Sequence, residues 1–181
     1  MDPEIVIRQI QAGDAEELSA LAKKIYQQYY LHLWHPGGAD WYMNEYAYPV
    51  NKLRTELEDE NNIFFIAYSG VAPVGYLKIS IHPHLENFNS DEFAELERIY
   101  ILQKFAGKGL GKQFMQIATD TAKQYNKKYL FLKAMDSAAH AITFYKKTGY
   151  QPIANFQLPM PTFCLMKKEF RGMIVLSKTI G

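Results

Sequence analysis

A glycine-rich run at residues 105–112, Phe-Ala-Gly-Lys-Gly-Leu-Gly-Lys, is the part of this 181-residue chain best suited to binding a ligand. Glycine has no Cβ, so the backbone N–H groups of the run can approach a ligand closely. A helical pattern follows at once, and the start of a helix offers unpaired N–H groups and a partial positive charge. Lys108 and Lys112 add two cations. Together these features predict a site for a phosphate or pyrophosphate.

Two familiar phosphate-binding motifs do not fit this run. A P-loop has four residues between its first glycine and a Gly-Lys-Ser/Thr end, whereas three residues separate Gly107 from Gly111, and Gln113 follows Lys112. The dinucleotide fingerprint Gly-x-Gly-x-x-Gly, started at Gly107, requires glycine at position 112, which is lysine. P-loop and dinucleotide-binding interpretations therefore fail. What remains is Gly-x-Gly-x-Gly at a strand-to-helix turn, or else a glycine-rich turn that binds nothing.

The hydrophobic pattern predicts the elements that position this turn. Strands are predicted at 4–10, 63–68, 74–81, 94–102, 129–132, 163–167 and 173–178. Helices are predicted at 14–25, 41–58, 110–125 and 137–148. Asp14 is the expected N-cap of the first helix, Pro49 interrupts the second and Gly149 ends the last. This order predicts an α/β protein with a mixed sheet and helices on both faces.

The composition is that of an ordinary globular protein. Apolar residues make up 48% and charged residues 22%, and the formal net charge is +1, without the basic excess of a nucleic-acid- or membrane-binding protein. The single cysteine excludes an internal disulfide and a cysteine-rich zinc site. The sequence shows no signal-peptide pattern and no apolar run near the roughly 20 residues of a membrane span. We expect one domain over residues 1–181, located in the cytoplasm, that binds neither nucleic acid nor membrane.

Two further motifs accompany the glycine run. Leu-Glu-Arg-Ile-Tyr-Ile at 96–101 precedes it, and Ala-Ile-Thr-Phe-Tyr-Lys-Lys-Thr-Gly-Tyr at 141–150 follows it. Together the three motifs resemble those of the GNAT superfamily of N-acetyltransferases, over essentially the whole chain. Within it they resemble the bacterial polyamine acetyltransferases of the PaiA type. The resemblance implies the GNAT fold, with a central, mostly antiparallel twisted sheet between helices. It also implies transfer of an acetyl group from acetyl-CoA to an amine, with no metal.

The same resemblance implies where acetyl-CoA binds. The family's loop usually begins with Arg or Gln where this chain has Ala106, and its last motif often carries asparagine where this chain has Ala138. Both departures bear on cofactor affinity, although backbone N–H groups should supply most contacts to the pyrophosphate. Lys147 is a candidate partner for the outer phosphate. The expected cofactor-binding residues are Ile99, Tyr100, Ile101, Ala106, Gly107, Lys108, Gly109, Leu110, Gly111, Lys112, Ala138 and Lys147.

Acetyl transfer to an amine needs a group that takes up a proton. An alkylammonium with a pKa of about 10.4 is almost fully protonated at neutral pH, so the site must remove a proton, directly or through water. Glu95 and Glu97 would share one face of a regular strand, but this strand is typically bulged in the family, which leaves their faces open. We expect Glu97 to be the base and Glu95 to be the second candidate. The alternative for each is a solvated carboxylate at a strand edge.

Tyr145 matches the position that serves as general acid in many members of the family. The leaving thiolate of coenzyme A, by analogy with cysteine, has a pKa of about 8.5, and a nearby phenol could hydrogen-bond or protonate it. The alternative is that Tyr145 only packs its helix against the sheet, as we expect of Phe144. Backbone N–H groups near Tyr100 or Ile101 are the expected donors to the oxyanion.

Other side chains carry weaker signals. His82 and His84 are spaced like metal ligands, but Pro83 interrupts them and no third ligand follows nearby, so we expect no metal site. The sequence has two acidic clusters, each of which is either solvated or attracts a cationic amine. The first is Glu56, Glu58, Asp59 and Glu60, and the second is Asp91, Glu92, Glu95 and Glu97. Cys164 lies in a predicted apolar strand, and we expect it to be buried and inert.

The sequence leaves three functions open. The leading one is acetylation of a small primary amine, such as a polyamine, that enters beside the first two helices. The second is the same chemistry on a protein N-terminus or lysine, which needs an open groove rather than a closed acidic pocket. The third is a CoA-binding regulatory module without turnover, which Ala106 and Ala138 favour and an intact Glu97 and Tyr145 oppose. Similar proteins are commonly homodimers, but the sequence shows no interface.

Overall fold

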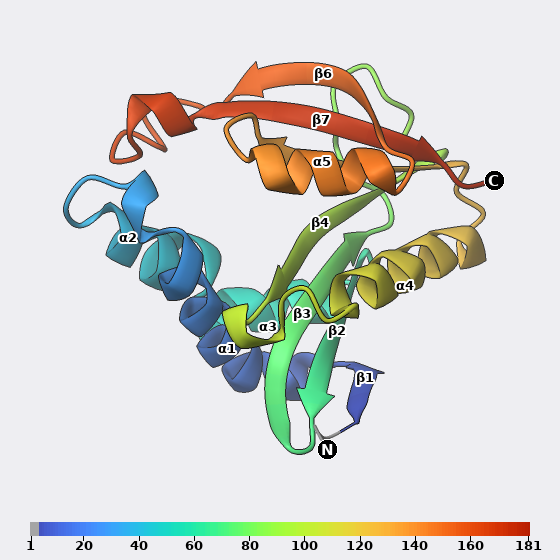
Figure 1. Cartoon of the computed structure of the whole chain (residues 1–181), viewed down its shortest axis with the longest axis horizontal. Coiled ribbons are helices and arrows are strands. Elements are labelled where there is room, and N and C mark those ends of the chain that lie inside the picture. The colour runs from blue at the N-terminus through green and yellow to red at the C-terminus, as the bar shows by residue number, and fades with distance from the viewer. Residues whose placement is uncertain (1–3) are drawn as a thin grey trace.

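The computed structural model describes residues 4–181, built around a twisted sheet of seven strands (Figure 1). In spatial order the strands are β1 (Ile5–Gln9), β2 (Asn62–Ser69), β3 (Ala72–Ser80), β4 (Phe93–Ile101), β5 (Tyr129–Met135), β7 (Gly172–Thr179) and β6 (Gln151–Gln157). Neighbouring strands are antiparallel except β4 and β5, which run parallel. The mixed, mostly antiparallel sheet that the sequence predicts is confirmed.

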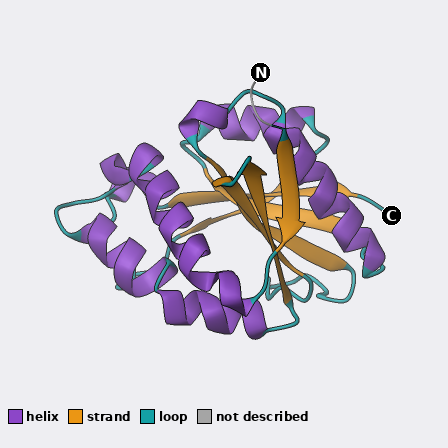
Figure 2. Cartoon of the chain, turned by 90° about the horizontal axis from the view of Figure 1, so that it is seen from below, coloured by secondary structure: helices purple, strands orange, loops and turns teal. Residues whose placement is uncertain are grey.

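Helices cover both faces of this sheet (Figure 2). They are α1 (Ala15–Tyr29), α2 (Gly38–Trp41), a π-helical segment (Tyr42–Ala47), α3 (Val50–Glu58), α4 (Leu110–Gln124) and α5 (Ala139–Lys147). Short 3-10 turns lie at 12–14, 31–33, 103–105 and 168–170. α1 and α3 pack on one face of β2, β3 and β4, and α4 packs on the other. None of the helices in residues 4–181 is long and apolar enough to cross a bilayer.

The core lies between these helices and the sheet because the apolar positions have helical or strand periodicity. Leu18 and Ile25 of α1 and Leu53 of α3 are buried on one side, and Phe114 of α4 is buried on the other. Burial of such a side chain stabilises the fold by about 1.5–3 kcal/mol. β2 is buried on both faces, which explains its continuous apolar sequence.

Two predicted helix signals have different outcomes. Pro49 does separate the predicted helix at 41–58, with α3 beginning directly after it. Asp14 stands just before α1, but its carboxylate makes no capping bond to that helix. It instead accepts hydrogen bonds from the backbone N–H of Gln11, at 2.9 Å, and from Arg8, at 3.1 Å. Asp14 therefore ties the start of the helical region to β1 rather than capping α1.

The prediction of a strand at 163–167 is wrong. These residues form a turn in which Phe163 and Met166 are buried, while Cys164, expected to be buried, is exposed. The edge strand next to β7 is instead β6, and its residues are mostly exposed. An exposed edge strand that contains Pro152 has little apolar alternation, so the sequence pattern does not reveal it. Gly149, with a φ angle of +97°, ends α5 as predicted.

The feature that matters most for a ligand site is the separation of β4 from β5. The two strands pair only over Phe93–Glu95 and 129–131. Beyond these residues β4 continues along β3, whereas β5 continues along β7, so the two strands diverge (Figure 1). The sheet therefore opens at its centre, directly before the glycine run.

Candidate active site

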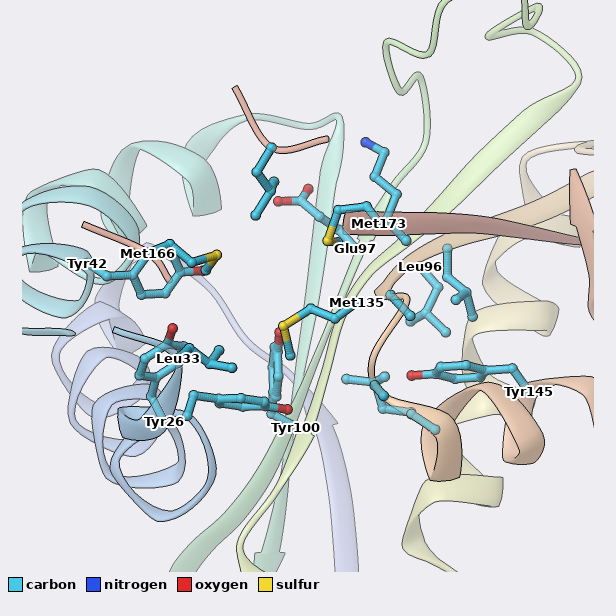
Figure 3. Close-up of a pocket in the computed structure, with 18 of the residues that line it drawn as sticks. Tyr26, Leu33, Tyr42, Leu96, Glu97, Tyr100, Met135, Tyr145, Met166 and Met173 are labelled. Carbon is cyan, nitrogen blue, oxygen red and sulfur yellow. The ribbon is translucent and has the colours of Figure 1, made fainter. Parts of the chain in front are cut away.

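A cavity of about 240 Å³ lies where β4 and β5 diverge, and we call it the central cavity (Figure 3). The residues that β4 contributes to its wall are Leu96, Glu97, Ile99 and Tyr100. Other walls come from α1, the π-helical segment, β5, α5 and residues 158–166. Tyr145 of α5 points its ring into the cavity. A concave, mostly apolar space with a few polar groups is the usual form of a small-ligand site.

A second hollow, of about 200 Å³, lies next to the central cavity, and we call it the outer hollow. Its wall includes Gly111, in the first turn of α4, and Phe144 of α5. Four residues line both spaces, and they are Tyr30, Ile99, Tyr100 and Tyr145. The two spaces are therefore adjacent, and we call the pair, from Gly111 to the central cavity, the channel.

The glycine run folds as a turn whose outer side is open. Gly107 and Gly109 have φ angles of +74° and +89°, in the left-handed region that other residues adopt only with strain. No described atom lies within 4 Å of the place where a Cβ would stand on either residue. α4 begins at Leu110, directly after Gly109. The structure thus has the predicted glycine-rich turn at a helix start, while phosphate binding there stays a prediction.

The predicted cofactor-binding residues divide between the channel and the surface. Those that line the outer hollow are Ile99, Tyr100, Ile101 and Gly111. Ala138 lines the central cavity, and Leu110 is buried, so Leu110 can offer a ligand only its backbone. The exposed ones, around the glycine run or near the end of α5, are Ala106, Gly107, Lys108, Gly109, Lys112 and Lys147.

A β-bulge separates the surroundings of the two candidate bases. The register of β4 against β3 shifts by one residue at Glu97, which makes Glu97 an extra residue in the ladder. Glu97 lines the central cavity. Glu95 lies outside the cavity lining, where it is 7% exposed and its carboxylate is 3.1 Å from Lys133 Nζ. The bulge therefore gives the two carboxylates different partners.

Glu97 belongs to a network of five charged side chains, in which Lys52 lies at the edge, 4.0 Å from Glu56. The buried Lys78 Nζ lies 2.8 Å from the carboxylate of Glu97 and 3.0 Å from that of Glu56 on α3. Arg98 lies 3.3 Å from Glu56 and 3.7 Å from Glu97. Each buried charge has an opposite charge beside it, which offsets the cost of removing it from water.

These partners set the pKa values of the two carboxyls in opposite directions. Burial raises the pKa of Glu97, but the positive charges of Lys78 and Arg98 outweigh burial and hold that pKa below its ordinary value. Burial also raises the pKa of Glu95, and there the attraction of Lys133 does not cancel it. Glu97 is therefore ionised at neutral pH, next to the cavity.

Tyr145 stands where the outer hollow meets the central cavity. Its ring lies 5.6 Å from that of Phe144 and 6.0 Å from that of Tyr150, centroid to centroid. Burial, with a smaller contribution from Tyr100, raises the pKa of the Tyr145 phenol far above its ordinary value. The phenol therefore keeps its proton at neutral pH and can donate a hydrogen bond into the channel.

The family is decided by comparison with known sequences. The acetyltransferase (GNAT) family model matches residues 23–150, which is well over half of the chain. The chain belongs to the GNAT family of acetyltransferases. The matched range includes the glycine run, both candidate bases and Tyr145.

Curated relatives of this GNAT chain are distant. An uncharacterized N-acetyltransferase of Lactobacillus delbrueckii subsp. lactis is 27% identical over 99 residues, which are 55% of this chain and 57% of that protein. The spermine/spermidine N(1)-acetyltransferase of Bacillus subtilis is 29% identical over 79 residues, which are 43% of this chain and 52% of that protein. The chain thus spans a little over half the length of the curated relatives that it matches.

Solved structures match almost the whole GNAT fold. The PaiA N-acetyltransferase of Thermoplasma acidophilum, in complex with coenzyme A, superposes with a TM-score of 0.75 over 97% of this chain and 99% of that one, at 18% identity. A putative acetyltransferase of Salmonella typhimurium, with acetyl-CoA, gives a TM-score of 0.71 over 98% and 95%, at 13% identity. At identities this low, the structural similarity confirms the predicted GNAT fold but does not identify a substrate or a mechanism.

Much of this GNAT chain's cavity wall is missed by sequence reasoning. Tyr26 and Tyr42 stack with ring centroids 4.7 Å apart, and the Tyr26 hydroxyl accepts a hydrogen bond from Trp34 Nε1 at 2.8 Å. Three methionines, Met135, Met166 and Met173, complete the apolar wall. The i, i+4 spacing of Tyr26 and Tyr30 on an amphipathic helix is a signal that could have found part of it.

The acidic cluster predicted at residues 56–60 does not line the central cavity. Glu56 pairs with Lys78 and Arg98 instead. Glu58, Asp59 and Glu60 line a separate groove together with His82. Across residues 4–181, no three His, Cys, Asp or Glu side chains are grouped so that they could hold a metal ion.

Proposed function

We propose that this protein is an N-acetyltransferase that transfers the acetyl group of acetyl-CoA to a small primary amine. The observation that carries the proposal is that the two adjacent hollows, one reaching Gly111 and the other lined by Glu97, share Tyr145 in their wall. A channel of this form suits two substrates that enter from opposite ends and react at the junction. Family membership supports the same chemistry.

The cofactor is assigned to the glycine end of the channel. Backbone N–H groups of residues 107–112 and the start of α4 would hold the pyrophosphate, and Lys108, Lys112 and Lys147 would contribute positive charge. The pantetheine arm would lie along Ile99–Ile101. There β4 pairs with β3 on one edge only, because β5 has diverged, so its other edge can bond the amides of the arm. Binding through backbone groups tolerates alanine at positions 106 and 138.

The reaction follows from the groups at the junction. The ammonium of the acceptor gives up a proton to Glu97, directly or through water, and its nitrogen attacks the thioester carbon. Backbone N–H groups near Tyr100 or Ile101 would stabilise the oxyanion. The carbon–sulfur bond then breaks, coenzyme A leaves as a thiolate, and the nitrogen releases its second proton to water as the amide forms. We rank Glu97 ahead of Glu95 because Glu97 lines the cavity, although the raised pKa of Glu95 suits a base.

Tyr145 is assigned to the leaving thiolate. Its pKa is raised far above that of a thiol, so complete transfer of its proton to the thiolate is unfavourable. A hydrogen bond from the phenol to the sulfur is the more favourable role. It stabilises the charge that develops as the carbon–sulfur bond breaks, because the site is buried and its polar partners are few.

The geometry favours this proposal over its two rivals. A protein acceptor needs an open groove, whereas the central cavity is a pocket of about 240 Å³ with residues 158–166 and the π-helical segment in its wall. A CoA-binding module without turnover has no use for Glu97 and Tyr145 in the channel wall. The name of the Bacillus subtilis relative makes polyamines one acceptor class to test.

The test is calorimetric titration of the protein with acetyl-CoA and, in parallel, with ATP and NAD. We expect acetyl-CoA alone to bind, and we expect amines to release free thiol from the complex. Failure of acetyl-CoA to bind would refute the proposal. Binding without amine-dependent thiol release would favour the regulatory module.

A further inference from the structure

The part of the central cavity away from the outer hollow differs in character from the junction. We call it the acceptor chamber, defined as the part of the central cavity whose walls are not shared with the outer hollow. Its apolar walls include Leu33, Leu158, Phe163, Met135, Met166 and Met173. Tyr26 and Tyr42 add stacked aromatic rings. These side chains come from α1 and the turn after it, the π-helical segment, β5, β7 and the loop after β6 (Figure 3).

Charge in the acceptor chamber is scarce and already paired. Among the described lining residues, Glu97 is the single carboxylate and Lys133 the single cation. Glu97 is bound by Lys78 at 2.8 Å, and Lys133 lies 3.1 Å from Glu95. With Glu56, Arg98 and Lys52 behind them, three carboxylates face four cations, so this group of charges carries no excess of negative charge.

We infer that the acceptor is an amine with one ammonium group on an apolar alkyl or aryl body, rather than a polyamine. This inference rests on the proposed function and names the substrate class of the same site. Glu97 is the one carboxylate of the wall, and its two oxygens have acceptor positions left beside Lys78, so it can hold the one ammonium that reacts. The methionine, leucine and aromatic walls would hold the apolar body, because burial of apolar surface is favourable there.

A polyamine fits this chamber poorly for an electrostatic reason. Its second ammonium would lie against apolar walls, because the described lining residues include no carboxylate besides Glu97. Burying an unpaired charge is strongly unfavourable, and the faces of Tyr26 and Tyr42 return only part of that cost. The acidic residues that could attract a polycation, Glu58, Asp59 and Glu60, line a different groove.

The direct test compares hexylamine with cadaverine, a diamine of equal heavy-atom count in which an ammonium replaces the terminal methyl. Thiol release from acetyl-CoA by the wild-type protein gives kcat/KM for each. We expect hexylamine to exceed cadaverine at least tenfold, and phenethylamine to exceed spermidine similarly. Equal or reversed values would overturn the inference and leave the proposed function standing. No thiol release with any of these amines would overturn both.

A second test places a charge in the acceptor chamber. Met166→Glu should shift the ratio of kcat/KM toward cadaverine at least fivefold, whereas Met166→Gln, of nearly equal shape, should not. Leu165→Glu, on the exposed side of the same turn, controls for net charge. Should Met166→Glu fail to fold, the pair Met173→Glu and Met173→Gln serves instead. An equal shift in the Gln or Leu165 variant would contradict the assignment of the chamber.

Discussion

The two ends of the channel differ in what they are made of. At the glycine end, one run of consecutive residues offers backbone groups in an exposed turn. In the acceptor chamber, side chains from distant segments of the sequence form a buried wall. Backbone groups serve a ligand almost regardless of the neighbouring side chains, whereas a wall of side chains changes with each substitution. The glycine end can therefore stay constant across relatives while the chamber sets acceptor specificity.

β4 joins these two ends. Glu97 lies in the chamber wall, and Ile99–Ile101 line the way toward the glycine run. One strand thus holds Glu97 and the strand edge that we propose for the cofactor at a fixed separation. Substitutions at the junction, the glycine end and the charged network should therefore affect catalysis, cofactor binding and pH dependence separately.

The largest expected effect is at the junction of the two ends. Tyr145→Phe should lower kcat by about a hundredfold, because it removes a donor to the leaving thiolate. The dissociation constant of acetyl-CoA should hardly change, since the ring remains. Thiol-release kinetics and calorimetry measure the two quantities.

Tyr150→Phe is the matched control for this substitution. It removes the hydroxyl group of the neighbouring ring. This buried hydroxyl has no hydrogen-bond partner within the described chain, so its loss should leave the site unchanged. Its kcat should equal that of the wild type. An equal loss of kcat and of acetyl-CoA affinity in Tyr145→Phe would reduce Tyr145 to a packing residue.

A smaller effect is expected at the glycine end. Gly109→Ala forces a Cβ into a left-handed turn, which costs about 1–2 kcal/mol and should distort the N–H groups before α4. Acetyl-CoA should bind about tenfold more weakly, with the hexylamine-to-cadaverine ratio unchanged. Gly13→Ala, at an ordinary φ and with open space around it, is the control. A changed ratio between amines would show that the two ends are not independent.

The smallest effect concerns pH. Glu97, with its pKa held below the ordinary 4.5, loses its charge only in more acidic solution, and Tyr145 keeps its proton because its pKa is raised. From about pH 6 to 9, kcat/KM should therefore be nearly independent of pH, because the ammonium form of the amine and the ionised form of Glu97 both predominate throughout. A tenfold rise per pH unit would show that only the small neutral fraction of the amine reacts, and it would contradict the role of Glu97 as the base. A rise to a plateau within this range would reveal a titrating group of the protein, and the raised pKa of Glu95 makes it the first candidate, which Glu95→Gln would test.

The sequence predicts the glycine end better than the chamber. The glycine run, Glu97 and Tyr145 are local motifs, and the structure brings Glu97 and Tyr145 into one channel with the start of α4. Strands such as β2 and helices such as α4 have strong periodicity, so their positions are predicted within a few residues. The roles of these site residues remain predictions.

The chamber could not be predicted because its contacts join distant positions. Nothing in the alternation of β3 distinguishes Lys78, buried between Glu56 and Glu97, from a solvated lysine. The apolar side chains of Phe163 and Met166 favour a strand in the sequence pattern, because apolar residues are common in strands. In the structure these side chains line the central cavity instead. Only the chain topology places them opposite β4.

The bulge at Glu97 leaves the residues on either side of it in register with β3. Ile79 pairs with Leu96 and Lys78 pairs with Arg98, so Glu97 has no partner of its own in the ladder. Deleting residue 97 would keep these two pairs and restore a regular ladder, because their partners on β3 already alternate between the two faces. An alignment gap at this position would therefore leave the strand intact and remove the carboxylate from the cavity wall.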